Sequence, residues 1–163
     1  MKKTILGLLL VFIGAGGLFF LQPEAKAEPV KTQEVQVVVV DPRPEKIDNY
    51  FKQRNMPLQG YGKKMVEVAD KHGLDWRLLP AISIRESSGG KHMCANNPFG
   101  WGSCRITFDN LDQAIETVGY KLENLPVYKG KTTERKLYYY NGTVVPTYPQ
   151  EVLDIMSKIE VTP

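Results

Sequence analysis

A short apolar segment that ends in a glutamate and runs into a loop of small and aromatic residues constrains this chain more than any other feature. Residues 80–102 read PAISIRESSGGKHMCANNPFGWG. At 3.6 residues per turn, Glu86 shares a helix face with Leu79 and Ile82, which is the face that such a helix turns toward a core. The sequence therefore predicts a helix that carries an acidic group at the end of its apolar face.

A carboxyl group in that position is expected to hold its proton more tightly than an exposed one. Burial disfavours the ionised form and raises the pKa, and a protonated carboxylic acid beside an open loop can act as a general acid. The alternative is that Glu86 lies in solvent or pairs with Arg85 or Lys91, since glutamate is rarely buried. The small residues at 87–90 favour the functional interpretation, because they end the helix and let a ligand approach its backbone.

The loop after this helix has the composition of a carbohydrate-binding surface. Residues 96–102 read NNPFGWG, with two amide side chains, two aromatic rings and three turn-forming residues. Amides can hydrogen-bond hydroxyl and acetamido groups, and ring faces can stack on sugar rings. The sequence therefore predicts a groove for a neutral polymer that bears these groups.

The order and spacing of these motifs resemble those of the bacterial cell-wall glucosaminidases and lytic transglycosylases of the lysozyme-like superfamily. A Glu-Ser-Ser-x-Gly helix end is followed ten residues later by Asn-Asn-x-Phe-Gly, and the likeness extends over residues 50–159. Each motif alone is weak, but their combination is more specific. In that family the glutamate is the catalytic acid and the Asn-x-Phe-Gly loop lines the sugar groove. The resemblance implies a mostly α-helical, lysozyme-like domain that acts on peptidoglycan.

The resemblance also implies a set of site residues. Residues 138–142 read YYYNG and are similar to the Tyr-Asn-x-Gly segment that closes the groove in the transglycosylases. Here the glycine follows the asparagine directly, which leaves the role of that asparagine open. The implied catalytic residue is Glu86, and the implied substrate-binding residues are Ser88, Asn97, Phe99, Trp101, Tyr140 and Asn141.

A second catalytic carboxylate is not evident in the sequence. Most glycosidases use two carboxyl groups, about 5–5.5 or 6.5–9.5 Å apart. Asp109 and Asp112 are candidates, but helix capping explains both more simply. The situation resembles that of lytic transglycosylases, in which one glutamate acts as acid and then as base while the acetamido group and 6-hydroxyl of the substrate complete the reaction. A hydrolytic endo-β-N-acetylglucosaminidase and a non-catalytic glycan-binding module are the alternatives.

The N-terminal residues predict export. A charged start, an apolar run over residues 5–21 and an Ala-x-Ala site at residues 25–27 are the three parts of a secretory signal peptide. The apolar run is close to the roughly 17–25 residues that span a bilayer, so an uncleaved membrane anchor is the alternative. Loss of residues 1–27 removes three lysines and one glutamate, which lowers the formal net charge from +3 to +1. A basic nucleic-acid-binding surface is therefore not implied.

The two cysteines, Cys94 and Cys104, bracket the Asn-Asn-Pro-Phe-Gly-Trp-Gly loop. In an exported protein such a pair predicts a disulfide, whereas two free thiols would require a reducing compartment. His72 and His92 do not complete a metal-ligand set with them. No phosphate-binding, dinucleotide-binding or serine-hydrolase motif occurs, so we expect neither a metal nor a cofactor.

The rest of the pattern predicts one helical domain behind a linker. A chain of 163 residues with 42% hydrophobic and 24% charged residues suits one small domain plus a tail. We expect a signal peptide or anchor at 1–27, an extended linker at 28–44 and a monomeric, extracytoplasmic catalytic domain at 45–163. Asp75 is the expected N-cap of the glutamate helix, with Pro80 bending it or delaying its start. The expected elements are helices at 45–55, 61–72, 75–86, 111–122, 132–140 and from 149 onward, with a short strand at 105–108.

Overall fold

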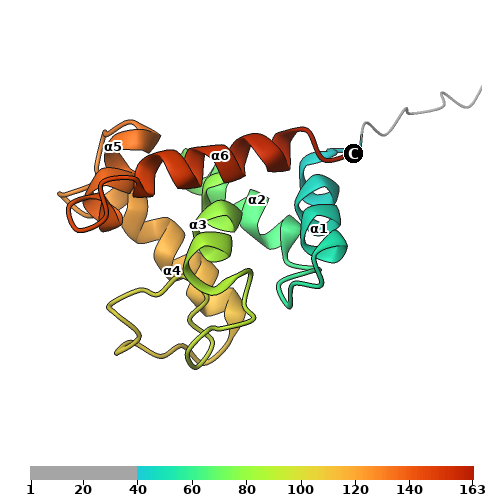
Figure 1. Cartoon of the computed structure of the whole chain (residues 1–163), viewed down its shortest axis with the longest axis horizontal. Coiled ribbons are helices and arrows are strands. Elements are labelled where there is room, and N and C mark those ends of the chain that lie inside the picture. The colour runs from blue at the N-terminus through green and yellow to red at the C-terminus, as the bar shows by residue number, and fades with distance from the viewer. Residues whose placement is uncertain (1–39) are drawn as a thin grey trace, which may run out of the picture. The chain divides into compact units, whose positions relative to one another are not determined.

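Six α-helices and one π-helical turn form the regular structure of residues 40–163, the part of the chain that the computed structural model describes (Figure 1). In chain order they are α1 (Arg43–Gln53), α2 (Gly62–His72), α3 (Leu78–Ser87), α4 (Leu111–Asn124), α5 (Thr133–Leu137), η1 (Tyr138–Gly142, the π-helical turn) and α6 (Tyr148–Glu160). The predicted mostly α fold class is confirmed.

The predicted strand at 105–108 is wrong. Within the described residues the only β-type pairing is an isolated bridge between Cys94 and Asn97. The carbonyl of Ile106 accepts a hydrogen bond from the Asn97 side chain instead of pairing with another strand. An irregular loop therefore connects α3 to α4.

The predicted signal peptide and most of the predicted linker lie outside the described residues. The helical domain begins slightly earlier than expected, because α1 starts at Arg43 with Pro44 in its first turn. Proline is well tolerated there, since the first N–H groups of a helix have no intrahelical partner. Within residues 40–163, no helix is both long enough and apolar enough to cross a membrane.

Helix α3 lies at the centre of the packing (Figure 1), and Glu86 is its second-to-last residue. The helix packs against α6 and α2, and its residues Leu78, Leu79 and Ile82 are completely buried. Burial of such side chains contributes about 1.5–3 kcal/mol each relative to exposure. The apolar face that the sequence predicted therefore anchors the helix that presents Glu86.

The start of α3 differs from the prediction that Asp75 is its N-cap. The carboxylate of Asp75 instead accepts hydrogen bonds from the backbone N–H and guanidinium of Arg77, and the helix begins at Leu78. Pro80 is then the third helical residue, where a missing N–H costs no helical hydrogen bond. The predicted late start is confirmed.

Other helix ends follow the sequence signals. The side chain of Asn110 accepts a hydrogen bond from the Gln113 N–H at 2.9 Å and caps α4. Gly73 ends α2 with φ at +64°, a left-handed conformation that favours glycine. The predicted helix at 132–140 is divided into α5 and η1.

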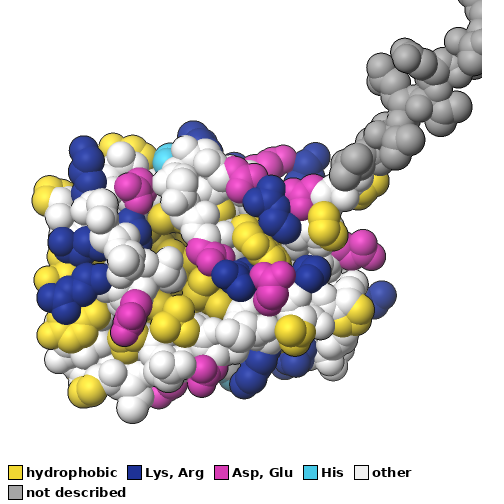
Figure 2. Space-filling view, turned by 90° about the horizontal axis from the view of Figure 1, so that it is seen from above, with side chains coloured by type: hydrophobic (Ala, Val, Ile, Leu, Met, Phe, Trp, Pro, Cys, Tyr) yellow, Lys and Arg dark blue, Asp and Glu magenta, His cyan; other side chains and the backbone are white. Residues whose placement is uncertain are grey.

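Positive and negative side chains lie next to one another on the face that α6 crosses (Figure 2). Arg77, just before α3, pairs with Glu160 at the end of α6 at 3.0 Å, and Lys46 of α1 lies 3.6 Å from the same carboxylate. These partly exposed pairs each contribute at most about 1 kcal/mol. They join the end of α6 to α1 and to the segment before α3.

Candidate active site

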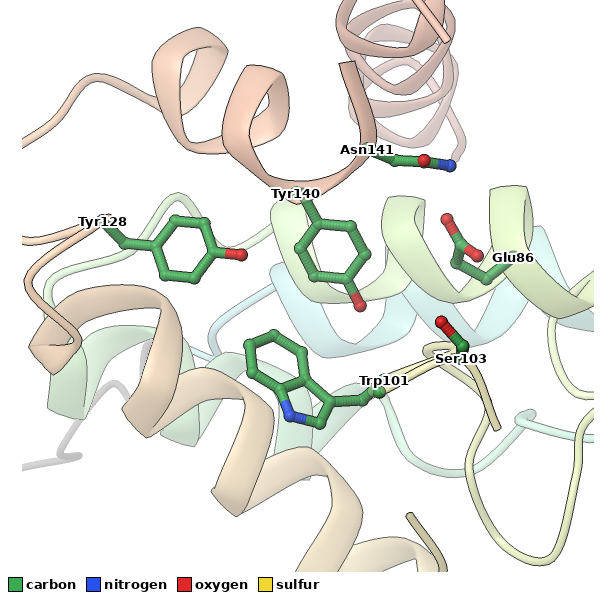
Figure 3. A pocket seen from close by; sticks show the side chains of 8 residues that line it. Glu86, Trp101, Ser103, Tyr128, Tyr140 and Asn141 are labelled. Carbon is green, nitrogen blue, oxygen red and sulfur yellow. The ribbon is translucent and has the colours of Figure 1, made fainter. Parts of the chain in front are cut away.

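Glu86 lines an open cavity of about 410 Å³ (Figure 3). The other lining residues are Gly100, Trp101, Gly102, Ser103, Tyr128, Tyr140 and Asn141. The structure thus brings together four of the predicted site residues, namely Glu86, Trp101, Tyr140 and Asn141. Glu86 is the only acidic residue in this lining.

The environment of Glu86 favours its protonated form. Burial raises the pKa of the Glu86 carboxyl, while the Tyr148 hydroxyl and the Arg85 charge lower it less strongly. The alternative pairings are not formed, because Arg85 pairs with Glu151 and the Lys91 ammonium donates to the Arg54 carbonyl. Glu86 therefore meets the first requirement of a general acid, which is a carboxyl pKa that its surroundings raise.

Tyr148 is the first residue of α6, and its hydroxyl lies close to the Glu86 carboxyl. The sequence did not predict it as a site residue. Its side chain is completely buried, and its ring stacks on Tyr140 with centroids 6.0 Å apart. Its hydroxyl makes no hydrogen bond of ordinary geometry within residues 40–163, although it is close enough to the carboxyl to lower the pKa of Glu86. Burial and the Glu86 charge in turn raise the pKa of Tyr148.

Replacement of Tyr148 by phenylalanine is expected to raise the pKa of Glu86 further, because the hydroxyl that favours the carboxylate is lost. Below about pH 4.5, where Glu86 is protonated in both the folded and the unfolded state, stability should stay equal or increase, since no hydrogen bond of good geometry is broken. A carboxyl-carbon NMR titration of Glu86 measures the first effect and thermal unfolding the second.

Tyr140→Phe is the matched comparison. The Tyr140 hydroxyl donates to the Phe99 carbonyl at 2.6 Å, so this variant leaves a buried acceptor unpaired. It should cost about 1–3 kcal/mol of unfolding free energy. A larger stability loss for Tyr148→Phe than for Tyr140→Phe would contradict this assignment.

Three aromatic rings form one wall of the cavity. The Trp101 ring centroid lies 5.6 Å from that of Tyr140 and 6.4 Å from that of Tyr128. Tyr128 was missed because it lies in a turn without a recognisable motif. The buried Lys136 ammonium holds this turn by donating to the Tyr128 carbonyl at 3.2 Å and the Leu122 carbonyl at 2.8 Å. The loop therefore positions the Trp101 ring, and Lys136 of α5 positions the turn that carries Tyr128.

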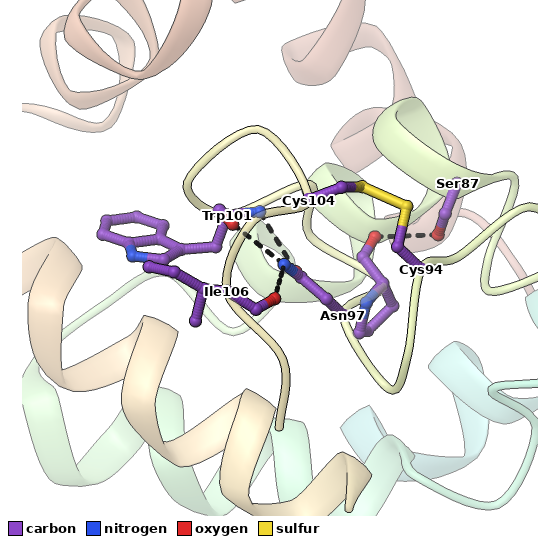
Figure 4. Close-up of a disulfide and its surroundings, with 7 residues drawn as sticks. Ser87, Cys94, Asn97, Trp101, Cys104 and Ile106 are labelled. Carbon is purple, nitrogen blue, oxygen red and sulfur yellow. Dashed lines mark hydrogen bonds between the residues drawn. A yellow bond between two sulfur atoms is a disulfide. The ribbon is translucent and has the colours of Figure 1, made fainter. Parts of the chain in front are cut away.

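Asn97 and Phe99 differ from their predicted role as sugar contacts. The Asn97 carboxamide donates to the carbonyls of Trp101 and Ile106, both at 2.9 Å, and accepts from the Trp101 N–H at 3.0 Å (Figure 4). Its hydrogen-bonding groups are occupied and its side chain is buried. Phe99 is completely buried in the core. Both residues shape the loop, and neither lines the cavity.

Ser87 and Ser88, which follow Glu86, have structural roles and do not line the cavity. Ser88 lies outside the cavity lining and ends α3 in a left-handed conformation with φ at +55°. The buried Ser87 hydroxyl lies 2.9 Å from the Ser83 carbonyl and 2.7 Å from the Pro98 carbonyl, which links α3 to the loop (Figure 4). Ser103 was not predicted, yet it lines the cavity from the far end of the loop.

The predicted disulfide between Cys94 and Cys104 is present, with Cα atoms 5.8 Å apart (Figure 4). The bridged loop contains several non-glycine residues with positive φ, namely Ala95, Asn96, Ser103 and Cys104. Such conformations cost about 1–2 kcal/mol each for ordinary residues. The disulfide therefore stabilises a loop conformation that several residues of the loop do not favour.

Replacement of both cysteines by serine is expected to lower the unfolding free energy by somewhat less than about 3 kcal/mol, the chain-entropy value for a loop of this length. The helical core should remain folded, because Phe99 is the one residue of the bridged loop that belongs to its fully buried hydrophobic cluster. The backbone around Trp101 and Ser103 should become more mobile. Faster amide hydrogen exchange across residues 94–104 would detect this change. Unchanged exchange in the double variant would contradict the proposed role of the disulfide.

The two other candidate acids lie away from the cavity lining. Asp109 accepts a hydrogen bond from the Gln113 side chain at 3.2 Å, and Asp112 lies exposed in the first turn of α4. Within residues 40–163, no group of three or more histidine, cysteine and acidic side chains is placed to hold a metal ion. The chemistry of the cavity thus depends on one carboxyl group, hydroxyls, an amide and aromatic rings.

Comparison with known proteins gives no identification, because no protein-family model matches the chain and no curated protein matches it significantly.

Proposed function

We propose that this chain cleaves β-1,4 glycosidic bonds in the glycan strands of peptidoglycan, with Glu86 as the acid and base, in a lysozyme-like domain. The observation that carries the proposal is the position of Glu86. It is the only carboxyl group in the lining of an open cavity, its pKa is raised by burial, and aromatic rings form the adjacent wall. Rings with neighbouring amide and hydroxyl groups suit an uncharged sugar.

In the first step, protonated Glu86 donates its proton to the glycosidic oxygen as the bond from that oxygen to the anomeric carbon breaks. Glu86 becomes a carboxylate. In the second step, this carboxylate accepts the proton of the 6-hydroxyl of the same sugar, whose oxygen then bonds to the anomeric carbon. Glu86 is protonated again, and the product ends in an anhydro sugar.

The single carboxyl group in the lining favours this lytic transglycosylase reaction over ordinary hydrolysis. An inverting enzyme needs a second carboxylate to activate water, and a retaining enzyme needs one as the nucleophile. The 6-hydroxyl is already attached to the reacting sugar, so its effective concentration can far exceed that of a free nucleophile. Hydrolytic endo-β-N-acetylglucosaminidase activity is the second candidate, because the cavity is open to water.

The disulfide supports an extracytoplasmic site of action. Structural disulfides form and persist mainly in oxidising compartments, where the predicted signal peptide would direct the chain. The proposed localisation is therefore the cell wall, the periplasm or the medium, with membrane attachment only if residues 1–27 are retained.

Release of soluble fragments from purified, insoluble peptidoglycan tests the proposal. The protein is expected to lower the turbidity of the suspension and to liberate sugar-containing fragments into the supernatant. A non-catalytic binding module would sediment with the polymer and release nothing. That result would exclude the enzymatic proposal while leaving glycan binding intact.

A further inference from the structure

A second cavity, of about 420 Å³, shares structural elements with the Glu86 cavity. It is lined by Thr132, Glu134, Arg135, Tyr138, Pro146, Pro149 and Gln150. Tyr138 belongs to η1, whose residues Tyr140 and Asn141 line the first cavity. Pro149 follows Tyr148, which stacks on Tyr140. The two cavities are thus lined by neighbouring residues of η1, and we call this one the Arg135 cavity.

Arg135 is held in place without a carboxylate partner among residues 40–163. Its guanidinium carbon lies 4.5 Å from the ring centroid of Tyr138 and 4.8 Å from that of Tyr139. One N–H group donates to the Tyr139 hydroxyl at 3.0 Å, which leaves most of its five donors unused. A guanidinium oriented by aromatic rings is suited to bind a carboxylate through two hydrogen bonds.

Glu134 supplies the opposite charge in the same lining. It is exposed and forms no ion pair within the described part of the chain, although Arg135 is its neighbour in sequence. The Gln150 side chain donates to Asp154 at 2.8 Å, so its carbonyl oxygen remains available as an acceptor. The remaining lining residues are Thr132, Tyr138 and the two prolines.

We infer that the Arg135 cavity binds a peptide that bears both a free carboxylate and a free amine, with the carboxylate on Arg135 and the ammonium near Glu134. A purely anionic ligand such as a phosphate polymer is disfavoured, because Glu134 would repel it. The apolar walls suit the aliphatic side chains of short peptides. The inference rests on the proposed function for the source of this peptide, because the peptides attached to peptidoglycan strands carry both charged groups.

NMR titration of the full chain with a synthetic peptide tests this inference. The probe is a tetrapeptide with a γ-linked glutamate and a diamino acid, without any sugar. It should shift the amide signals of Arg135, Tyr138 and Gln150, and N-acetylation of its free amines should weaken binding. Arg135→Gln should weaken binding at least about tenfold, the factor for loss of one of the two charge-assisted hydrogen bonds. Lys158→Gln, an exposed change in the last turn of α6, should leave binding unchanged.

Several results would overturn the inference. They are the absence of shifts around Arg135, equal binding of the acetylated peptide or of inorganic phosphate, and unchanged binding by Arg135→Gln. Because the probe contains no glycosidic bond, these outcomes do not depend on glycan cleavage. Peptide binding without release of glycan fragments would reject the proposed function alone.

Digestion kinetics test whether the Arg135 cavity contributes to substrate binding during cleavage. Digestion of intact strands should show a higher KM for Arg135→Gln, whereas strands stripped of their peptides should be digested equally by the parent and the variant. An equal KM effect on both substrates would indicate a general disturbance of η1 and would overturn the peptide site.

Discussion

Glu86→Gln is expected to lower the rate of fragment release from peptidoglycan by at least about a hundredfold, the lower range for loss of a general acid and base. Glutamine keeps the size and hydrogen-bonding capacity of the side chain but has no proton to transfer. Glu67→Gln is the matched control, because Glu67 is exposed on α2 and only pairs with Lys63 at 3.8 Å. The control should digest peptidoglycan at the parent rate.

The same variant should be at least as stable as the parent at neutral pH. Burial raises the pKa of Glu86 above its ordinary value of 4.5, so the folded state binds this proton more tightly than the unfolded chain does. Stability therefore falls as pH rises from about 4.5 through the folded-state pKa, and the penalty is complete above it. Glu86→Gln removes this penalty, so its melting temperature should match or exceed that of the parent at pH 7. The difference should shrink below the unfolded-state pKa.

A lower melting temperature for Glu86→Gln at pH 7 would contradict the buried, proton-retaining environment described for this carboxyl. Activity near that of the parent would show that Glu86 does not carry the chemistry. The two measurements separate loss of catalysis from loss of fold.

Gly100→Ala should have the second largest effect on cleavage. Gly100 has φ at +60°, and a Cβ added there would lie 2.7 Å from Oε2 of Glu86. The new methyl group must move either the loop or the carboxyl that would protonate the substrate. Because displacement of a catalytic group by 1 Å can cost about a hundredfold in rate, we expect a loss of that order. Fragment release and the melting temperature should be measured together.

Gly130→Ala separates the steric effect from the backbone effect. Gly130 has a similar φ of +67°, but an added Cβ would meet no atom within 4 Å. Both variants carry the cost of about 1–2 kcal/mol for a side chain in the left-handed region. Only Gly100→Ala should lose most of its activity. Equal activity losses in the two variants would contradict the contact between the loop and Glu86.

The sequence predicted the helices and the central acid because local patterns determine both. The helices expected at 61–72, 111–122 and from 149 onward correspond to α2, α4 and α6, whose ends at Gly73 and Asn110 depend on short-range interactions. Glu86 was identified from its own helix face. The interpretation of 105–108 as a strand failed because β-branched and aromatic residues also occur where a side chain such as Asn97 satisfies the backbone.

Site residues contributed by distant segments were harder to predict. Motif spacing places Asn97 and Phe99 near Glu86, but it does not distinguish a side chain that contacts a ligand from one that holds the loop. Tyr148 reaches the site through the packing of α6 against α3, and Tyr128 reaches it from the turn after α4, which Lys136 of α5 holds. Burial and hydrogen-bond partners were needed to assign each of these residues.

The central claim is that one glutamate cleaves the glycan while the 6-hydroxyl of the substrate replaces water. Mass spectrometry of the fragments released by the purified protein tests this most directly, since hydrolysis adds one water at each cleaved end and anhydro formation adds none. We expect fragments that end in an anhydro sugar, and no such fragments from Glu86→Gln. If every fragment carries the added water and ends in reducing N-acetylglucosamine, the transglycosylase mechanism is wrong and the protein is a hydrolytic glucosaminidase.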